Sequence, residues 1–435
     1  MEKRAYIFNT GCIRRALDMT KIHEYLLRNG WQLVNDIFSA DIIIISTCGV
    51  VERQERLSLA AIRDITKKRN PSAKVFITGC LTKIDPGKIQ DIGEFTLIST
   101  RDLSQFDEAL NSRVEFENVP DANVLTNQGG IFDYVLAYRF LRNSFLLEVF
   151  RRLGTSEKFL RFCVFVNHNV NSIKYKLGLT SRKKILAYYN IRIAHGCLCA
   201  CTFCATRFAT GKLKSKPEDR IIEEFKNGLR EGYRIFQLVN EDTGCYGIDI
   251  GTTFPNLLRA ILAIEGNYQL ILIDFNPQWI VEYYDELLSI FLEHRGKIKE
   301  LFVSLQSGSD RILKAMGRSY DIETVENMLI DLRKQVPEIM LRTTALIGFP
   351  GETEEDFEMT KKAIQKIGFS EVEIDKYEDR PGTRSSMMKD KIPQEIINRR
   401  GRELNKAMDI ARVGGLRRAK PESQRQCKMK FAGGS

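Results

Sequence analysis

Short apolar runs alternate with amphipathic helical segments along two stretches of this chain, and this alternation restricts the fold more than any other feature. In residues 1–110, strand-like runs at Tyr6–Asn9, Asp41–Ser46 and Lys74–Thr78 are separated by helical patterns at Asp18–Asn29 and Glu52–Lys68. Apolar runs of this length fit strands that helices bury on both faces. The first stretch is therefore predicted to be a doubly wound parallel sheet of the α/β class.

The same alternation resumes at Asn190 and continues to about Ala411. Helical patterns fall between the strand candidates, notably at Pro217–Glu231, Trp279–His294 and Glu352–Ile367. Six strand–helix units predict a partial (β/α)6 barrel, smaller than the full eight-stranded form. The six strand candidates are Ile191–Ala194, Ile235–Val239, Leu270–Asp274, Glu300–Val303, Met340–Ile347 and Glu371–Asp375.

The 435 residues, of which 43% are hydrophobic, are enough for two or three domains. The predicted division is an N-terminal domain at 1–115, a linker with a basic-aromatic helical insertion at 116–185, a barrel at 186–413 and a basic tail at 414–435. No run of about 18 uncharged apolar residues occurs, and the N-terminus does not resemble a signal peptide. A cytoplasmic protein without a membrane span is therefore expected.

Positive charge is concentrated in two segments. The chain has a net charge of +10, but Tyr138–Ile185 alone carries +9 and Arg412–Lys430 carries +6. Within the first segment, Tyr138–Leu153 has the spacing of an amphipathic basic helix. Such segments are typical of docking to an anionic partner, whether RNA, an acidic peptide or a surface. A solvated helical face and a frayed tail explain the charge equally well.

Four of the ten cysteines lie in one short segment, where Cys197, Cys201 and Cys204 have the spacing C-x3-C-x2-C and Cys199 lies between them. Without export, this composition favours metal or redox chemistry over a disulfide framework. Three thiolates on a tight loop can hold three irons of a [4Fe–4S] cube and leave the fourth iron open. A structural zinc site that uses Cys199 as its fourth ligand is the competing interpretation, although zinc sites favour paired C-x2-C hooks.

Three further cysteines each follow a predicted strand of the N-terminal domain. Cys12, Cys48 and Cys80 each lie beside a glycine, directly after the first, second and third strand runs. Because the carboxyl ends of parallel strands meet at one edge, these thiols are expected to converge. Three unrelated buried cysteines remain the alternative. Cys245 has no such neighbours and is interpreted as structural or incidental.

In these residues the chain resembles the radical SAM methylthiotransferases over nearly all of residues 1–110 and 186–411. Single motifs of this kind are weak evidence, but their joint order is specific. The barrel core most resembles the branch that modifies threonylcarbamoyl-adenosine in tRNA. Besides both cysteine sets, the matching motifs are Ala205–Ala209, Glu241–Gly247, Ser304–Asp310, Ile347–Glu352 and Arg380–Thr383.

The resemblance implies an enzyme with two [4Fe–4S] clusters that uses two molecules of S-adenosylmethionine (SAM) per turnover. Cys197, Cys201 and Cys204 would hold the cluster that cleaves SAM, and Cys12, Cys48 and Cys80 an auxiliary cluster. An external sulfide or persulfide source and an electron donor such as flavodoxin or ferredoxin are implied as well. SAM contacts are expected at seven residues, for each of which an ordinary loop interaction is the alternative: Phe203, Asp242, Gln306, Ser307, Gly348, Gly351 and Glu352.

Three departures from the family pattern bear on the substrate. Cys199 replaces the usual Gly, and Arg14 and Arg15 stand where an Asn usually follows the first cysteine closely. The segment from about Val119 to Ile185 is longer than the usual linker, and only Gly414–Ser435 follows the barrel, where tRNA-modifying members carry an RNA-binding domain. We therefore expect a peptide or protein side chain as substrate. A modified adenosine of tRNA is the alternative, and a non-catalytic iron–sulfur protein is a remote third.

Overall fold

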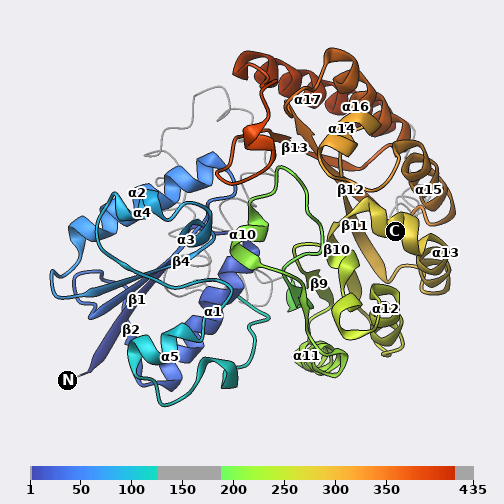
Figure 1. Cartoon of the computed structure of the whole chain (residues 1–435). Helices are drawn as coiled ribbons and strands as arrows, with labels where there is room; N and C mark the ends of the chain where they lie inside the picture. The colour runs from blue at the N-terminus through green and yellow to red at the C-terminus, as the bar shows by residue number, and fades with distance from the viewer. Residues whose placement is uncertain (1, 126–187, 417–435) are drawn as a thin grey trace, which may run out of the picture. The chain divides into compact units, whose positions relative to one another are not determined.

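The computed structural model describes residues 2–125 and 188–416 (Figure 1). Its N-terminal sheet has five parallel strands in the order β2-β1-β3-β4-β5. The three central strands, β1 (Lys3–Asn9), β3 (Ile42–Thr47) and β4 (Lys74–Gly79), contain the three runs expected from the sequence. The edge strands β2 (Trp31–Leu33) and β5 (Thr96–Leu97) are short and were not predicted.

Helices cover both faces of this sheet, as a doubly wound arrangement requires (Figure 1). One face carries α1 (Ile13–Arg28) and α5 (Gln105–Leu110). The other carries α2 (Glu52–Lys68), α3 (Leu81–Ile84) and α4 (Gly87–Gln90).

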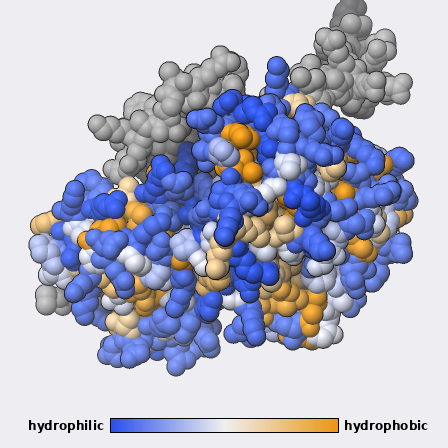
Figure 2. All heavy atoms as spheres, turned by 45° about the horizontal axis from the view of Figure 1, so that its top comes forward, coloured by the Kyte–Doolittle hydropathy of each residue, from blue (hydrophilic) through white to orange (hydrophobic). Residues whose placement is uncertain are grey.

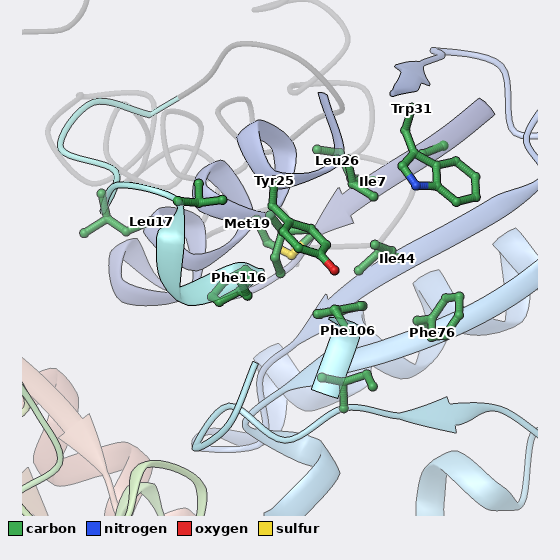
Figure 3. Close-up of a cluster of buried hydrophobic side chains, with 14 of the residues drawn as sticks. Ile7, Leu17, Met19, Tyr25, Leu26, Trp31, Ile44, Phe76, Phe106 and Phe116 are labelled. Carbon is green, nitrogen blue, oxygen red and sulfur yellow. The ribbon is translucent and has the colours of Figure 1, made fainter. Parts of the chain in front are cut away.

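The alternation along β3 explains why its sequence is apolar throughout. Ile42 and Ile44 belong to the core under α1, whereas Ile43 and Ile45 belong to the core under α2. Successive side chains of a strand point to opposite faces, so a strand buried on both sides needs no polar position. Figure 3 shows the first of these cores, where Ile44 lies among side chains from β1, β4, α1 and α5.

The second sheet contains six parallel strands in the order β13-β12-β11-β10-β9-β6. This parallel sheet with helices between its strands is the α/β core that the alternation predicted. Its strands are β6 (Tyr189–Arg192), β9 (Ile235–Val239), β10 (Gln269–Phe275), β11 (Ile298–Gln306), β12 (Met340–Ile347) and β13 (Glu371–Lys376). The longer helices between and after them are α11 (Glu218–Arg230), α12 (Phe254–Leu262), α13 (Pro277–Glu293), α15 (Ile322–Gln335), α16 (Glu354–Ile367) and α17 (Gln394–Leu416).

Several strands extend beyond their predicted bounds, and one ends before its predicted end. The expected strand Ile191–Ala194 is wrong at its end, because β6 stops at Arg192. Ala194 and His195 form β7, which pairs antiparallel with β8 (Lys214–Ser215). The sequence does not mark the end of β6, because apolar residues continue beyond Arg192, whereas the strand that the backbone pairs with changes from β9 to β8. The cysteine loop that follows therefore begins at a two-stranded pairing and not at the end of the parallel strand.

The chain divides into two compact units. The first comprises 1–274, 296–299 and 378–386, and the second comprises 275–295, 300–377 and 387–435. The N-terminal sheet thus shares a unit with β6, β9 and β10. Most of the predicted insertion at 116–185 lies outside the described residues, as does the tail from residue 417 onward.

In the described part of the chain, no helix is both long and apolar enough to cross a bilayer. On the face shown in Figure 2, hydrophobic residues form several separate patches among hydrophilic ones.

The contact between β3 and β4 yields a first prediction. Gly79 has φ 97°, and a Cβ there would lie 2.2 Å from the carbonyl oxygen of Thr47. Gly30 has φ 78° but no atom within 4 Å of its virtual Cβ. In Gly30→Ala, only the left-handed backbone conformation should lower the free energy of unfolding, by about 1–2 kcal/mol. Gly79→Ala must also displace the β3 backbone.

We expect a lower thermal unfolding midpoint for Gly79→Ala than for Gly30→Ala, measured by circular dichroism on the full chain. Equal midpoints would show that the β3–β4 contact is not as tight as described.

Candidate functional site

Cys12, Cys48 and Cys80 all lie just beyond the carboxyl ends of β1, β3 and β4. The strand register aligns these ends, because Asn9 pairs with Ser46 and Thr47 pairs with Gly79. Cys12 precedes the first residue of α1, and Cys80 precedes the first residue of α3. The structure therefore brings the three predicted residues to one edge of the N-terminal sheet.

The three thiols are close enough to influence one another. Burial, with a smaller contribution from Cys12, raises the pKa of Cys48 to about 11. Burial also raises the pKa of Cys80, with additional contributions from Cys48 and Cys12 and an opposing one from Arg15. Cys48 and Cys80 are buried, whereas Cys12 is exposed. The neutral thiol is thus favoured at Cys48 and Cys80, and a bound metal would have to displace their protons.

A buried ion network begins next to Cys12 and connects α1 to the barrel strands of the same unit. Arg14 donates to the Asp274 carboxylate at 2.7 Å and to the Asn240 carbonyl at 3.1 Å. Arg192 donates to Asp18 and to the backbone carbonyl of Arg14. These contacts fix the start of α1 against the carboxyl ends of β6, β9 and β10.

Asp18 and Arg15 form the inner part of this network. Arg15 Nη1 lies 3.2 Å from Asp18 Oδ2, and both side chains are buried. Burial alone would raise the pKa of Asp18, but Arg15 and Arg192 outweigh it and the pKa is lowered. Asp18 is therefore held as a carboxylate.

Glu241 extends the network to the second cysteine segment. Its Oε2 accepts the Gly196 N–H at 2.9 Å, directly before Cys197. Its Oε1 lies 3.7 Å from Arg14 Nε and 4.0 Å from Arg15 Nη2. One carboxylate thus contacts both the helix that follows Cys12 and the loop that begins at Gly196. Sequence reasoning recognised Glu241 only as part of a motif.

In the second segment, Cys197 and Cys199 lie next to Asp242. Cys197, Cys199 and Asp242 each offer a ligand atom, and these three atoms lie within 4.8 Å of one another. The Cys199 thiol donates to Asp242 Oδ2 at 3.4 Å, and its backbone N–H donates to Cys197 Sγ at 3.2 Å. Cys204 N–H donates to the Cys201 carbonyl at 3.3 Å, which closes a turn between these two predicted ligands.

Cys245 lies near this segment, although the sequence gave no reason to include it. Its thiol donates to the Asp242 carbonyl at 3.0 Å, and it is fully buried. A hydrogen bond with Cys199 lowers the pKa of Cys197, but a hydrogen bond with Cys245 and burial raise it overall. Phe203 is half-buried within the loop. The predicted SAM contacts Phe203 and Asp242 thus both belong to the first unit, next to the cysteines.

The other five predicted SAM contacts belong to the second unit. Gln306 ends β11 with φ 71°, at an irregularity in the β11–β12 register. The Ser307 hydroxyl is buried within 3.2 Å of Thr360 Oγ1 and accepts the Ser309 N–H at 3.2 Å. Both residues therefore help to shape the turn after β11. A SAM contact at Gln306 and Ser307 stays a prediction.

Gly348, Gly351 and Glu352 form the turn after β12. The two glycines have φ values of 79° and 80°. Glu352 Oε2 accepts the Gly348 N–H at 2.7 Å and a hydrogen bond from Arg400 Nη1 at 2.7 Å, so it braces the turn from within. Burial raises the pKa of Glu352 to about 7, against the opposing effects of Gly348 and Arg400. A role for this turn in SAM binding stays a prediction.

Comparisons with known proteins identify the class of this arrangement. Residues 191–364 match the radical SAM superfamily, and residues 4–98 match the family described as Uncharacterized protein family UPF0004. The structure of the radical S-adenosylmethionine methyltransferase TsrM from Kitasatospora setae, with cobalamin and a [4Fe-4S] cluster bound, has a TM-score of 0.58 at 14% identity. That similarity covers 89% of this chain and 77% of TsrM and concerns the fold alone.

Two curated relatives narrow the class to a family. A probable threonylcarbamoyladenosine tRNA methylthiotransferase of Archaeoglobus fulgidus is 31% identical, over 95% of this chain and 84% of that protein. The ribosomal protein uS12 methylthiotransferase RimO of Clostridium tetani is 30% identical, over 92% of this chain and 80% of RimO. The protein is thus a radical SAM enzyme. It belongs to the methylthiotransferases, which transfer a sulfur-containing group, and its cofactors are SAM and a [4Fe–4S] cluster.

The turn after β12 generates a second prediction, on pH. The folded-state pKa of Glu352 lies above its ordinary value of 4.5, so folded protein binds this proton more tightly than unfolded protein. Its contribution to stability is complete below about pH 4.5 and is lost as the pH rises through about 7. Between about pH 5 and about pH 8, the stability of wild type relative to Glu352→Gln should therefore fall, as measured by thermal unfolding midpoints.

Glu354→Gln is the matched control, because Glu354 contacts the same Arg400 from the surface. Hydrogen bonds from Arg399 and Arg400 lower the pKa of Glu354 below 4.5. Its difference from wild type should stay constant over the same range. A constant difference for Glu352→Gln as well would contradict a raised pKa.

Proposed function

We propose that the protein is a two-cluster methylthiotransferase. The cluster that cleaves SAM is assigned to Cys197, Cys201 and Cys204, and an auxiliary cluster to Cys12, Cys48 and Cys80. The observation that carries this proposal is the position of the second set, directly after three neighbouring parallel strands whose ends are in register. Three thiols per set match the ligand count of a [4Fe–4S] cube with one open iron.

The residues present fit such groups. Cys12, Cys48 and Cys80 act on one another electrostatically, and the Nε and Nη1 atoms of buried Arg15 have no hydrogen-bond partner near them. When bound, the two clusters and SAM supply the radical chemistry that replaces an unactivated C–H bond by C–SCH3. A sulfide or persulfide supplies the sulfur, a second SAM supplies the methyl group, and a flavodoxin or ferredoxin supplies the electrons.

The surrounding protein groups would position these parts. Glu241 holds the Gly196 backbone at the start of the cysteine loop, and Asp242 accepts a hydrogen bond from the Cys199 thiol. Arg14, anchored by Asp274, fixes the start of α1 beside Cys12. In this proposal residues 1–115 carry the auxiliary cluster and residues 186–413 carry SAM. SAM contacts are assigned to Phe203 and Asp242 in the first unit and, in the second unit, to Gln306, Ser307, Gly348, Gly351 and Glu352.

The substrate we propose first is a peptide or protein side chain. The positive charge concentrated in Tyr138–Ile185 and Arg412–Lys430 is compatible with an acidic peptide as well as with RNA. A relative of 30% identity is named for modification of a ribosomal protein.

An adenosine of tRNA is the second candidate. The supporting observation is that relatives of 29–31% identity are named as tRNA methylthiotransferases. In that case the phosphate contacts would come from basic residues outside the described part, such as Arg139, Arg142, Arg151 and Arg152.

Iron content tests the cluster assignments. Anaerobically reconstituted protein should bind about eight irons, since two sets of three thiolates imply two cubes. The triple variant Cys197→Ala, Cys201→Ala, Cys204→Ala should lose half of this iron and all formation of 5′-deoxyadenosine. The triple variant Cys12→Ala, Cys48→Ala, Cys80→Ala should lose half of the iron and retain SAM cleavage.

Cys199→Ala is the matched control, because Cys199 lies in the same loop outside the C-x3-C-x2-C set. It should retain full iron and the electron paramagnetic resonance (EPR) spectrum of the SAM-bound cluster. If the Cys12/Cys48/Cys80 variant kept the full iron content of the wild type, the assignment of the auxiliary cluster to these cysteines would be wrong.

Salt dependence of tRNA binding tests the substrate. If tRNA is the substrate, neutralising Arg139, Arg142, Arg151 and Arg152 with Gln should flatten the slope of log Kd against log salt by about one unit per lost phosphate contact. Neutralising the exposed α2 residues Arg56, Arg63, Lys67 and Lys68 should change it less. If a peptide is the substrate, wild type should bind tRNA only in the non-specific range, roughly 10⁻⁴–10⁻⁶ M at physiological salt.

Mass spectrometry of the products completes this test. Gain of one SCH3 group on a candidate peptide supports the first substrate. Methylthio-adenosine in the nucleoside digest of incubated tRNA would overturn it in favour of the second.

A further inference from the structure

Arg15 is a buried cation, and two of its three guanidinium nitrogens, Nε and Nη1, have no hydrogen-bond partner within the described structure. It lies in the first turn of α1, three residues after Cys12, and only 2% of it is exposed. Its stem is held in place, because a Cβ on Gly11 would lie 2.5 Å from the Arg15 Cβ. The guanidinium therefore has little freedom to move to solvent.

The atoms of this guanidinium are unequally satisfied. Nη1 lies 3.2 Å from Asp18 and Nη2 lies 4.0 Å from Glu241, but neither contact has the geometry of a hydrogen bond, and Nε and Nη1 have no partner. The neighbouring Arg14 differs, since its Nη1 donates to Asp274 and to the Asn240 carbonyl. A buried charged donor without an acceptor is costly, so such a group ordinarily faces a partner that the protein chain does not supply.

The cysteine site lies within reach of this charge. Burial opposes the charged form of Arg15, and the groups that favour it are, in order, Asp18, Cys80, Cys12 and Glu241. Arg15 lies in the first turn of α1, which starts directly after Cys12 at the same end of the sheet as Cys48 and Cys80.

We propose that Arg15 donates N–H hydrogen bonds to sulfur atoms of the cluster held by Cys12, Cys48 and Cys80, and thereby raises its reduction potential. This inference rests on the proposed auxiliary cluster. Sulfide and thiolate sulfurs become stronger acceptors as the cluster gains an electron, so donors stabilise the reduced state. The step adds one electron from an external one-electron donor and transfers no proton, because Arg15 stays protonated throughout.

A merely structural ion pair between Arg15 and Asp18 is the competing explanation. It would make Arg15 important for folding but would leave the cluster potential unchanged.

The test uses the full chain in which Cys197, Cys201 and Cys204 are replaced by Ala, so that only the auxiliary site can hold a cluster. Its midpoint potential is measured by EPR-monitored redox titration. Arg15→Met should move the potential to more negative values by at least a tenfold change in the reduction equilibrium, about 59 mV for one electron. Arg15→Lys, which keeps the charge with fewer donors, should give a smaller shift.

Arg28→Met is the control for loss of one α1 charge, because Arg28 lies at the far end of the same helix, where its Nε pairs with Glu24 at 2.8 Å. Its shift should be well below that of Arg15→Met. Equal shifts for the two variants, or no shift for Arg15→Met, would overturn the proposal. About four irons in the parent chain would show that the auxiliary cluster exists. A parent chain without iron would refute the proposed function. A parent chain with iron, but without a shift of the potential in Arg15→Met, would refute only the role of Arg15.

A second measurement covers the case in which Arg15→Met does not assemble a cluster. Protein labelled with guanidino-¹⁵N-arginine is reduced, and the hyperfine coupling of ¹⁵N to the auxiliary cluster is recorded by pulsed EPR. The coupling should be present with Arg15 and absent in Arg15→Lys. Absence of the coupling in the Arg15 protein, or its persistence in Arg15→Lys, would overturn the hydrogen bond.

Discussion

Parallel pairing of β1, β3 and β4 is the constraint on which the N-terminal part of the molecule depends. The register places Asn9 beside Ser46 and Thr47 beside Gly79, so all three strands end at the same level. Gly79 permits this alignment, since any side chain there would meet the Thr47 backbone. Three cysteines that are distant in sequence thereby share one edge, and no local motif is needed to bring them there.

A second constraint is the charged network between α1 and the barrel strands of the first unit. Arg14, Arg192 and Glu241 connect the residues after Cys12 to the residues before Cys197. Buried charges need well-placed partners, and loss of one partner leaves the other unpaired at high cost. The network therefore fixes the geometry around both cysteine sets more firmly than apolar packing could, because each contact has a required direction.

The sequence was sufficient to predict the α/β class, the central strands and the family, because these follow from apolar periodicity and from short motifs. Periodicity was less informative at the boundaries. Helix α1 begins at Ile13, five residues before its predicted start, because the polar residues Arg15 and Asp18 are buried against each other and not in solvent. The strands β2 and β5 are too short to show a pattern.

The ion network could not be predicted at all. Arg14 and Asp274 are 260 residues apart, and nothing local in either segment marks them as partners. Cys245 was set aside for the same reason, although it lies beside Asp242 in space.

The two cysteine sets differ in how their members come together, and this difference determines the order in which the protein can mature. Cys197, Cys201 and Cys204 occupy eight consecutive residues, so even an unfolded chain presents them to a metal as one chelating peptide. Cys12, Cys48 and Cys80 meet only after the sheet has closed in register. If both sets bind clusters as proposed, metal capture at the barrel loop can precede folding, whereas capture at the sheet edge must follow it.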